Sequence, residues 1–147
     1  MLFMAEPTTL TIHIEAPVAK VFAFWADPGN WKQVAQAEYT FEDIVVTPQG
    51  VGTTYREVEK VAPGVRLEYR GRFTDFVVNA RIVEEYEGHL AGTFVYQFDP
   101  QGSGMQFTLE HIPAAIGKVP VVGAIMEGQM AHKCQRLLTD LKTLMEA

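Results

Sequence analysis

The first 34 residues change their hydrophobic period twice, and this order constrains the fold more than any other feature of the chain. Apolar and polar residues alternate from Thr8 to Ile14, which predicts a half-buried strand. Pro17 suits the first position of a helix, because its missing N–H needs no partner there. Apolar residues recur at helical spacing over 18–25, and a break at 27–30 precedes a second short helix anchored by Trp31. A strand followed by two very short helices and then by a long run of strands predicts a curved sheet that encloses another part of the molecule.

The next part of the chain reads as a series of strands separated by turn residues. The clearest is Val65 to Phe73, in which apolar residues and Tyr69 share one face and charged residues share the other. Short connections predict that neighbouring strands pair antiparallel, mostly as a meander. The predicted strands span residues 39–47, 51–61, 65–73, 76–86, 90–98 and 105–112.

The last part of the chain switches to a period of 3.6 after Pro120, which predicts a long amphipathic helix. The whole pattern predicts an α+β fold in which a curved antiparallel sheet of about seven strands wraps around the C-terminal helix, with two short helices after the first strand. We expect a single domain over residues 1–147. Because a straight helix cannot touch a curved sheet along its whole length, we also expect a ligand cavity between them.

Composition limits the partners and the compartment. The net charge of −6 argues against nucleic acid as a partner. No apolar run reaches the length of a membrane span, so we expect no stable membrane insertion. The single cysteine, Cys134, excludes an internal disulfide and fits a cytoplasmic protein. The composition is also compatible with a homodimer.

The segment IEAPVAKVFAFWADPGNWKQV carries a family resemblance. The elements Ala16-Pro17, Val21-Phe22 and Asp27-Pro28 with Trp31 resemble the opening of the START-like, polyketide cyclase/dehydrase and lipid-transport superfamily, which includes the birch-pollen allergens. The turn Gly50-Val51-Gly52-Thr53 and the final long helix are also similar to that family. The resemblance implies a helix-grip fold with a cavity between sheet and helix, and it carries over no catalytic residue.

Four side chains are candidates for acid–base chemistry: Tyr55, Glu57, Tyr69 and His111. Tyr69 shares a face with Leu67, which points it at the cavity, although a role in the packed core has equal weight. Alternation cannot decide which face of the 51–61 strand is wet, and a solvated face is the favoured interpretation for Glu57. If Glu57 points inward, an apolar cavity would raise its pKa. For His111, a structural role is favoured over a catalytic one.

The residues expected to line the ligand cavity share an apolar or aromatic character and an inward parity: Trp25, Leu67, Tyr69, Phe73, Tyr96, Phe107, Met126 and Met130. Packing is the favoured role for Trp25 and Trp31, since large aromatic side chains serve as core readily. The spacing of His, Cys, Asp and Glu residues predicts no metal site, and no motif indicates a cofactor.

Three functions fit this pattern. The favoured one is a carrier or sensor that binds a hydrophobic or aromatic small molecule in the cavity. The alternative is a polyketide cyclase, aromatase or dehydratase that uses Tyr, Glu and His groups as acid and base. A third is an interaction module, as in the chaperone-activator branch of the same superfamily, which would use the outer face of the sheet and a large exposed apolar patch.

Overall fold

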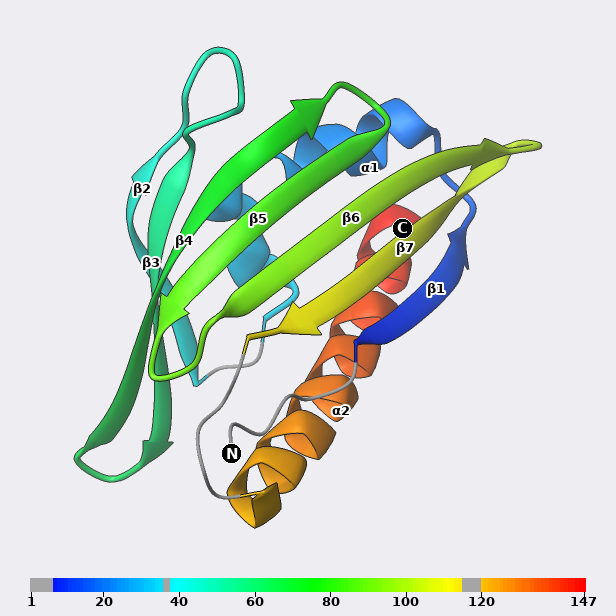
Figure 1. Ribbon diagram of the computed structural model, residues 1–147. Coiled ribbons are helices and arrows are strands. Elements are labelled where there is room, and N and C mark those ends of the chain that lie inside the picture. The colour runs from blue at the N-terminus through cyan, green and yellow to red at the C-terminus, as the bar shows by residue number, and fades with distance from the viewer. Residues whose placement is uncertain (1–6, 36–37, 115–119) are drawn as a thin grey trace.

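A computed structural model describes residues 7–35, 38–114 and 120–147, and the side chains of all these residues except 120–129 (Figure 1). The elements in chain order are β1 (Thr8–Ile14), α1 (Val18–Trp25), the 3-10 helix η1 (Pro28–Gln33), β2 (Tyr39–Val45), β3 (Thr54–Ala62), β4 (Val65–Val77), β5 (Arg81–Gly88), β6 (Gly92–Gln101), β7 (Gly104–Pro113) and α2 (Pro120–Met145).

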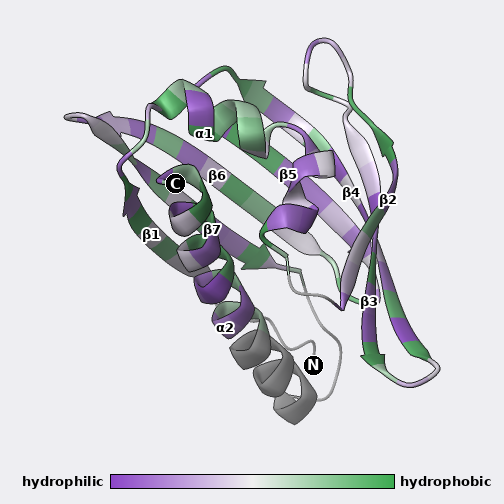
Figure 2. Ribbon diagram, turned by 180° about the vertical axis from the view of Figure 1, so that it is seen from behind, coloured by the Kyte–Doolittle hydropathy of each residue, from purple (hydrophilic) through white to green (hydrophobic). Residues whose placement is uncertain are grey.

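The seven strands form one antiparallel sheet in the order β1-β7-β6-β5-β4-β3-β2. Strands β2 to β7 are a continuous meander, and β1 closes the row by pairing with β7. Both α1 and α2 lie on the same face of the twisted sheet (Figure 2). The predicted α+β helix-grip architecture, with two short helices after the first strand and a long helix at the end, is confirmed.

The two short helices are held against the sheet by a pair of tryptophans. Helix α1 begins at Val18, one residue after Pro17, and turns its apolar side inward. The Asp27 carboxylate accepts a hydrogen bond from the Gly29 N–H at 2.8 Å and caps η1. The Trp31 indole N–H then donates to the Trp25 carbonyl at 3.0 Å, and the two rings stack with centroids 5.1 Å apart. The break between the helices therefore brings both rings to one place.

The C-terminal end of α2 is fixed to β1 and to the start of α1. The Lys142 ammonium donates to the His13 carbonyl at 2.7 Å, and the Lys20 ammonium donates to the Met145 carbonyl at 2.8 Å. Leu138 and Leu141 are fully buried beneath this end of the helix. Each such side chain contributes roughly 1.5–3 kcal/mol by leaving water. The firmly packed part of the core therefore lies at this end.

Two expectations from the sequence need correction. The break between the third and fourth predicted strands is not at residues 74–75, because β4 continues to Val77 through a bulge and the chain reverses at Asn79, whose φ is +59°. Side chains of β3 that were expected to face solvent also point inward, and Glu59 is only 7% exposed. Within the described residues, no helix is both long and apolar enough to cross a membrane.

Candidate functional site

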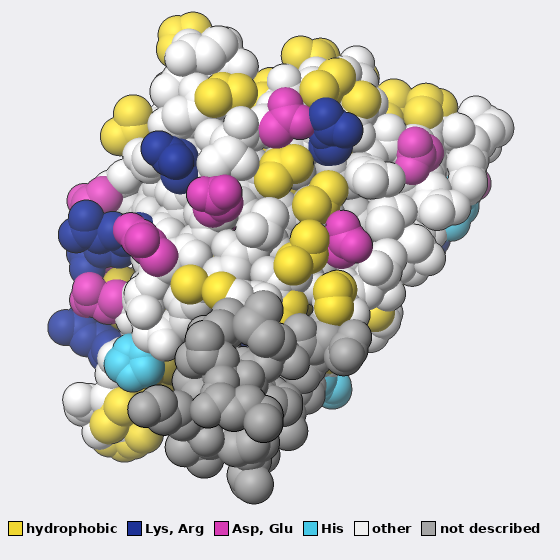
Figure 3. Space-filling view, in the orientation of Figure 1, with side chains coloured by type: hydrophobic (Ala, Val, Ile, Leu, Met, Phe, Trp, Pro, Cys, Tyr) yellow, Lys and Arg dark blue, Asp and Glu magenta, His cyan; other side chains and the backbone are white. Residues whose placement is uncertain are grey.

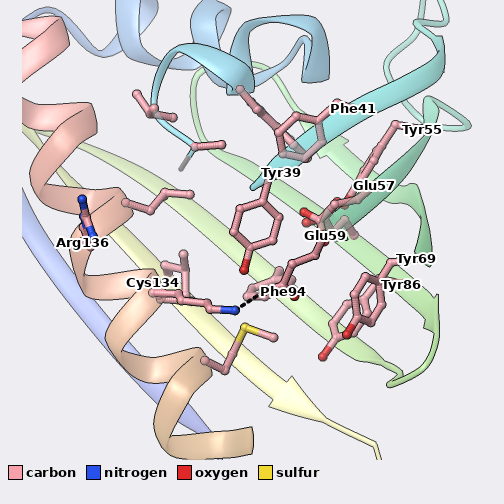
Figure 4. Close-up of a pocket in the computed structure, with 18 of the residues that line it drawn as sticks. Tyr39, Phe41, Tyr55, Glu57, Glu59, Tyr69, Tyr86, Phe94, Cys134 and Arg136 are labelled. Carbon is pink, nitrogen blue, oxygen red and sulfur yellow. Dashed lines mark hydrogen bonds and ion pairs between the residues drawn. The ribbon is translucent and has the colours of Figure 1, made fainter. Parts of the chain in front are cut away.

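A cavity of about 180 Å³ lies between the inner face of β3–β6, the short helix η1 and α2 (Figure 4). Aromatic side chains contribute a large part of its walls: Trp25, Trp31, Tyr39, Phe41, Tyr55, Tyr69, Tyr86, Phe94 and Tyr96. Four carboxyl groups also line it: Glu57, Glu59, Glu84 and Asp140. The lining residues Val61, Arg136 and Asp140 are exposed, so the cavity reaches the surface beside them.

Glu84 lies at the bottom of the cavity and is only 1% exposed. The Tyr55 hydroxyl donates to one carboxylate oxygen at 2.6 Å, and the Tyr96 hydroxyl donates to the other at 2.5 Å. Burial raises the pKa of Glu84 to about 7, although the two hydrogen bonds oppose the rise. The carboxyl group is therefore close to half ionised at neutral pH, and its two phenol partners stay protonated.

A glycine in the middle of β4 makes this contact possible. Gly71 lies between Tyr55 on β3 and Tyr86 on β5 in the register of the sheet. A Cβ at Gly71 would lie 2.2 Å from the Tyr55 ring, so the ring occupies the space that a side chain would fill. Tyr55 thus crosses β4 to reach Glu84 on the next strand. Glycine within a strand often marks such a close approach.

A second tyrosine also packs over a glycine of the neighbouring strand, one strand further along the sheet. Tyr86 on β5 lies over Gly92 on β6, where an added Cβ would be 2.8 Å from its hydroxyl oxygen. The hydroxyl reaches Nε2 of His111 on β7 at 2.7 Å. His111 is 5% exposed, and burial lowers its pKa to about 4. The imidazole is therefore neutral at physiological pH and orients the Tyr86 phenol.

Glu57 and Tyr69 are polar residues of the cavity wall that are free to contact a guest, and the buried indole N–H of Trp25 also has no partner among the described residues. Glu57 and Tyr69 are directly opposite each other across β3 and β4, and neither side chain forms a hydrogen bond within the described residues. Burial raises the pKa of Glu57 to about 8, and the nearby charges of Glu84 and Glu59 add to the rise, whereas Lys133 opposes it. Burial also raises the pKa of Tyr69 to about 12. Both groups are protonated at pH 7.

Helix α2 reaches the sheet across the cavity through an ion pair between Lys133 and Glu59. The Lys133 ammonium also lies 5.2 Å from the centre of the Tyr39 ring, a distance at which a cation is attracted to the ring face. Figure 4 shows the Tyr39 hydroxyl pointing into the space beside this pair. Burial, followed by the charge of Glu59, raises the pKa of Tyr39. This contact joins α2 to β3 and β2.

The structure brings three of the four acid–base candidates into the cavity wall: Tyr55, Glu57 and Tyr69. His111 lies behind Tyr86 instead, stacked 4.6 Å from Phe94. Its position fits the structural role that the sequence favoured.

Most of the predicted ligand-contact residues are also placed around the cavity, namely Trp25, Leu67, Tyr69, Tyr96 and Met130. Phe73 and Phe107 are fully buried and pack against other rings of the core, Phe73 near Trp31 and Phe76, and Phe107 near Trp25 and Phe98. The Met126 side chain lies outside the described residues. Trp25 and Trp31 combine both roles, since each packs in the core and lines the cavity.

Sequence reasoning missed Glu84, Tyr86, Tyr39 and Lys133. For Glu84 a signal was present, because it has the same parity as Ile82 and Tyr86 and so is a charged residue at an inward position. Lys133 was placed near the apolar stripe of the helix, but no pattern in the sequence indicates that it pairs with Glu59. Within the described ranges, no three His, Cys, Asp or Glu side chains are close enough together to hold a metal ion.

The outer face of the sheet has a different character. Figure 3 shows acidic and basic side chains interspersed with hydrophobic ones on this face. A hollow there is lined by charged residues that include Arg56, Arg70, Arg72, Glu85 and Glu87. The described part of this face therefore offers weaker support for an apolar docking surface than the cavity offers for a small molecule.

Comparisons with known proteins agree with this architecture. A sequence model of the family described as polyketide cyclase / dehydrase and lipid transport matches residues 7–146. No curated protein matches the chain.

Many solved structures have the same fold. A Chromobacterium violaceum protein has a TM-score of 0.75 at 17% identity, over 97% of this chain and 99% of that one. A Thermus thermophilus protein has a TM-score of 0.72 at 20% identity, over 94% and 95% of the two chains. A putative uncharacterized protein from Rhizobium leguminosarum has a TM-score of 0.68 at 23% identity, over 96% and 95%.

Proposed function

Because this chain belongs to the polyketide cyclase / dehydrase and lipid transport family, we propose that it binds a small hydrophobic or aromatic molecule in the cavity between its sheet and α2. The observation that carries the proposal is an aromatic cavity with two wall groups, Glu57 and Tyr69, that lack hydrogen-bond partners within the described residues. A carboxyl group that faces a cavity without a protein partner can form a hydrogen bond with a bound ligand, and this bond favours binding. The protein would then act as a carrier or sensor.

The volume limits the size of the guest. Pockets for drug-sized ligands measure roughly 300–1,000 Å³, whereas a cavity of roughly 150 Å³ accepts benzene. The cavity of about 180 Å³ therefore suits a molecule of one ring with a short polar substituent. A larger guest would either extend to the surface beside Val61, Arg136 and Asp140 or require α2 to move away from the sheet, which means breaking the Lys133–Glu59 ion pair.

Tryptophan fluorescence offers a direct test, because both tryptophans of the chain line the cavity. Titration with 2-phenylethanol should change the emission in a saturable way and should raise the melting temperature. Cys134→Phe adds a ring inside the cavity and should abolish binding. Gln135→Phe adds the same ring on the exposed side of α2 and should leave binding intact.

If Cys134→Phe does not fold, a substitution that adds less volume to the cavity still tests the proposal. Ala35→Leu fills the wall of the cavity nearest η1 and should weaken binding severalfold. If both cavity variants bind 2-phenylethanol as well as the native chain does, the molecule occupies another place and the proposal fails.

A second candidate function is acid–base catalysis on the bound molecule, and the pairing of Glu57 with Tyr69 favours it. Above pH 8 the Glu57 carboxylate would accept a proton from the carbon next to a carbonyl group, and the Tyr69 hydroxyl would donate a hydrogen bond to the enolate oxygen. Exchange of the α-protons of acetophenone in D₂O, followed by NMR, measures this step. Exchange at the uncatalysed rate, or equal exchange with Glu57→Gln, would rule it out.

A further inference from the structure

The cavity lining carries more carboxyl groups than basic groups, and this bears on the class of ligand that the proposed function requires. Three glutamate side chains face the same small space, Glu57, Glu59 and Glu84, and Asp140 adds a fourth carboxyl group at its exposed edge. Glu57 is enclosed by protein and directed into the cavity, with no hydrogen-bond partner among the described residues. A guest that accepts hydrogen bonds or carries negative charge meets repulsion from all three groups when they are ionised.

The tyrosine hydroxyls at the bottom of the cavity already have partners, whereas the Tyr69 hydroxyl in the wall has none among the described residues. The Tyr55 and Tyr96 hydroxyls each donate their only proton to Glu84. Toward the rest of the cavity these phenols present oxygen lone pairs. The Tyr86 hydroxyl shares a hydrogen bond with Nε2 of His111. The phenols at the bottom of the cavity therefore add to its acceptor character.

Of the two positive charges that line the cavity, one is paired and the other is exposed to solvent. Lys133 pairs with Glu59, which is 7% exposed. Arg136 is exposed at the rim, one turn of α2 away from Asp140. Aromatic ring faces attract cations, and Lys133 already uses the face of Tyr39 in this way. Among the described lining residues, neither basic group is left as an obvious partner for an anionic guest.

We propose that the preferred guest is a small aromatic or alicyclic amine, bound as an ammonium ion whose N–H groups donate to Glu57 and whose charge lies among the aromatic rings. The inference rests on the proposed binding function and names the chemical class of its ligand. An ammonium group supplies the donors that Glu57 lacks. It also balances the excess of carboxyl groups in the cavity.

Binding of such a guest releases a proton. The ammonium ion enters with its own proton, the Glu57 carboxyl group loses one to solvent, and the bound state is an ammonium–carboxylate pair. Affinity should therefore rise with pH up to about 8, by as much as tenfold per pH unit. The titratable and charged groups around Glu57 are Tyr39 on β2, Tyr55 and Glu59 on β3, Tyr69 on β4, Glu84 and Tyr86 on β5, Tyr96 on β6, and Lys133, Cys134, Arg136 and Asp140 on α2.

The test compares three probes of matched shape: phenethylamine, 2-phenylethanol and phenylacetate. Isothermal titration at pH 7.5 should give at least tenfold tighter binding of the amine than of the alcohol, with phenylacetate weakest. Titration of the amine in phosphate and in Tris buffer should give different apparent enthalpies, because a proton is released. Glu57→Gln should reduce the amine-to-alcohol affinity ratio to about one, whereas Glu85→Gln, on the outer face of β5, should leave it unchanged.

The outcomes distinguish failure of the amine preference from failure of the proposed binding function. If 2-phenylethanol binds in the cavity but the amine binds no more tightly, the amine inference is wrong and the binding function stands. Preference for phenylacetate, or an amine preference that survives Glu57→Gln, also overturns the inference. If none of the probes binds, the proposed function for one-ring ligands fails, and the inference fails with it.

Discussion

Replacing Glu57 with glutamine should flatten the pH dependence of stability between pH 6.5 and 8.5. In the folded protein the pKa of Glu57 is raised from 4.5 to about 8, mainly by burial. Over this range the unfolded chain has already lost the proton and the folded chain still holds it. Folding therefore takes up a proton, and stability falls as the pH rises. The decline begins near the unfolded-state pKa of 4.5 and levels off above pH 8, because the folded chain has then lost the proton as well.

The size of the effect follows from these pKa values. Glu57 should lower the free energy of unfolding by about 2 kcal/mol between pH 6.5 and 8.5, from 1.36 kcal/mol per pKa unit. Glu84, whose pKa is raised to about 7, adds less than about 1 kcal/mol by the same relation. His111 adds little here, because its lowered pKa affects stability below pH 6.5.

Urea unfolding followed by tryptophan fluorescence measures the slope at each pH. The native chain should lose about 2–3 kcal/mol across the range, and Glu57→Gln should lose less than about 1 kcal/mol. Glu85→Gln removes an exposed carboxyl from the outer face of the neighbouring part of the sheet, and it should keep the native slope. If Glu57→Gln retains the full decline, Glu57 does not hold a proton in an enclosed cavity and the description of the site is wrong.

Three further changes test the contacts around the cavity. Gly71→Ala should lower stability by about 2–4 kcal/mol in chemical unfolding, because its Cβ would displace the Tyr55 ring and leave buried Glu84 with one partner fewer; a loss under about 0.5 kcal/mol would contradict this packing. Lys133→Met should cost about 1–3 kcal/mol at pH 7 by leaving Glu59 unpaired, while the exposed Lys60→Met should be nearly neutral. His111→Gln should reduce the loss of stability between pH 6.5 and 4, since folded His111 resists protonation; an unchanged acid slope would refute this.

The architecture was predictable from the sequence because it depends on hydrophobic periodicity and turn chemistry. The alternation in β1 and β4, the Pro-containing starts of the short helices and the period of 3.6 after Pro120 all describe one consistent fold. The exception is the β4–β5 reversal. It is made by Asn79 in the left-handed region rather than by glycine or proline, so the expected turn signal was missing.

The candidate site was only partly predictable, because parity arguments need a contrast between a wet and a dry face. That contrast is lost in β3, where the cavity itself holds Glu57 and Glu59 and the opposite face is also charged. The crossing of Gly71 by Tyr55 depends on side-chain rotamers and on neighbours two strands away. The pairing of Lys133 with Glu59 depends on how α2 is rotated against the sheet, which a helical period alone does not fix.

A crystal structure of the protein with phenethylamine or 2-phenylethanol bound would test the central claim most directly. We expect the aromatic ring to lie between the inner face of the sheet and α2, near Trp31 and Tyr69, with the polar end of the ligand within hydrogen-bonding distance of the Glu57 carboxyl group. A ligand bound only on the outer face, or a cavity filled by protein side chains in the presence of saturating ligand, would contradict the account.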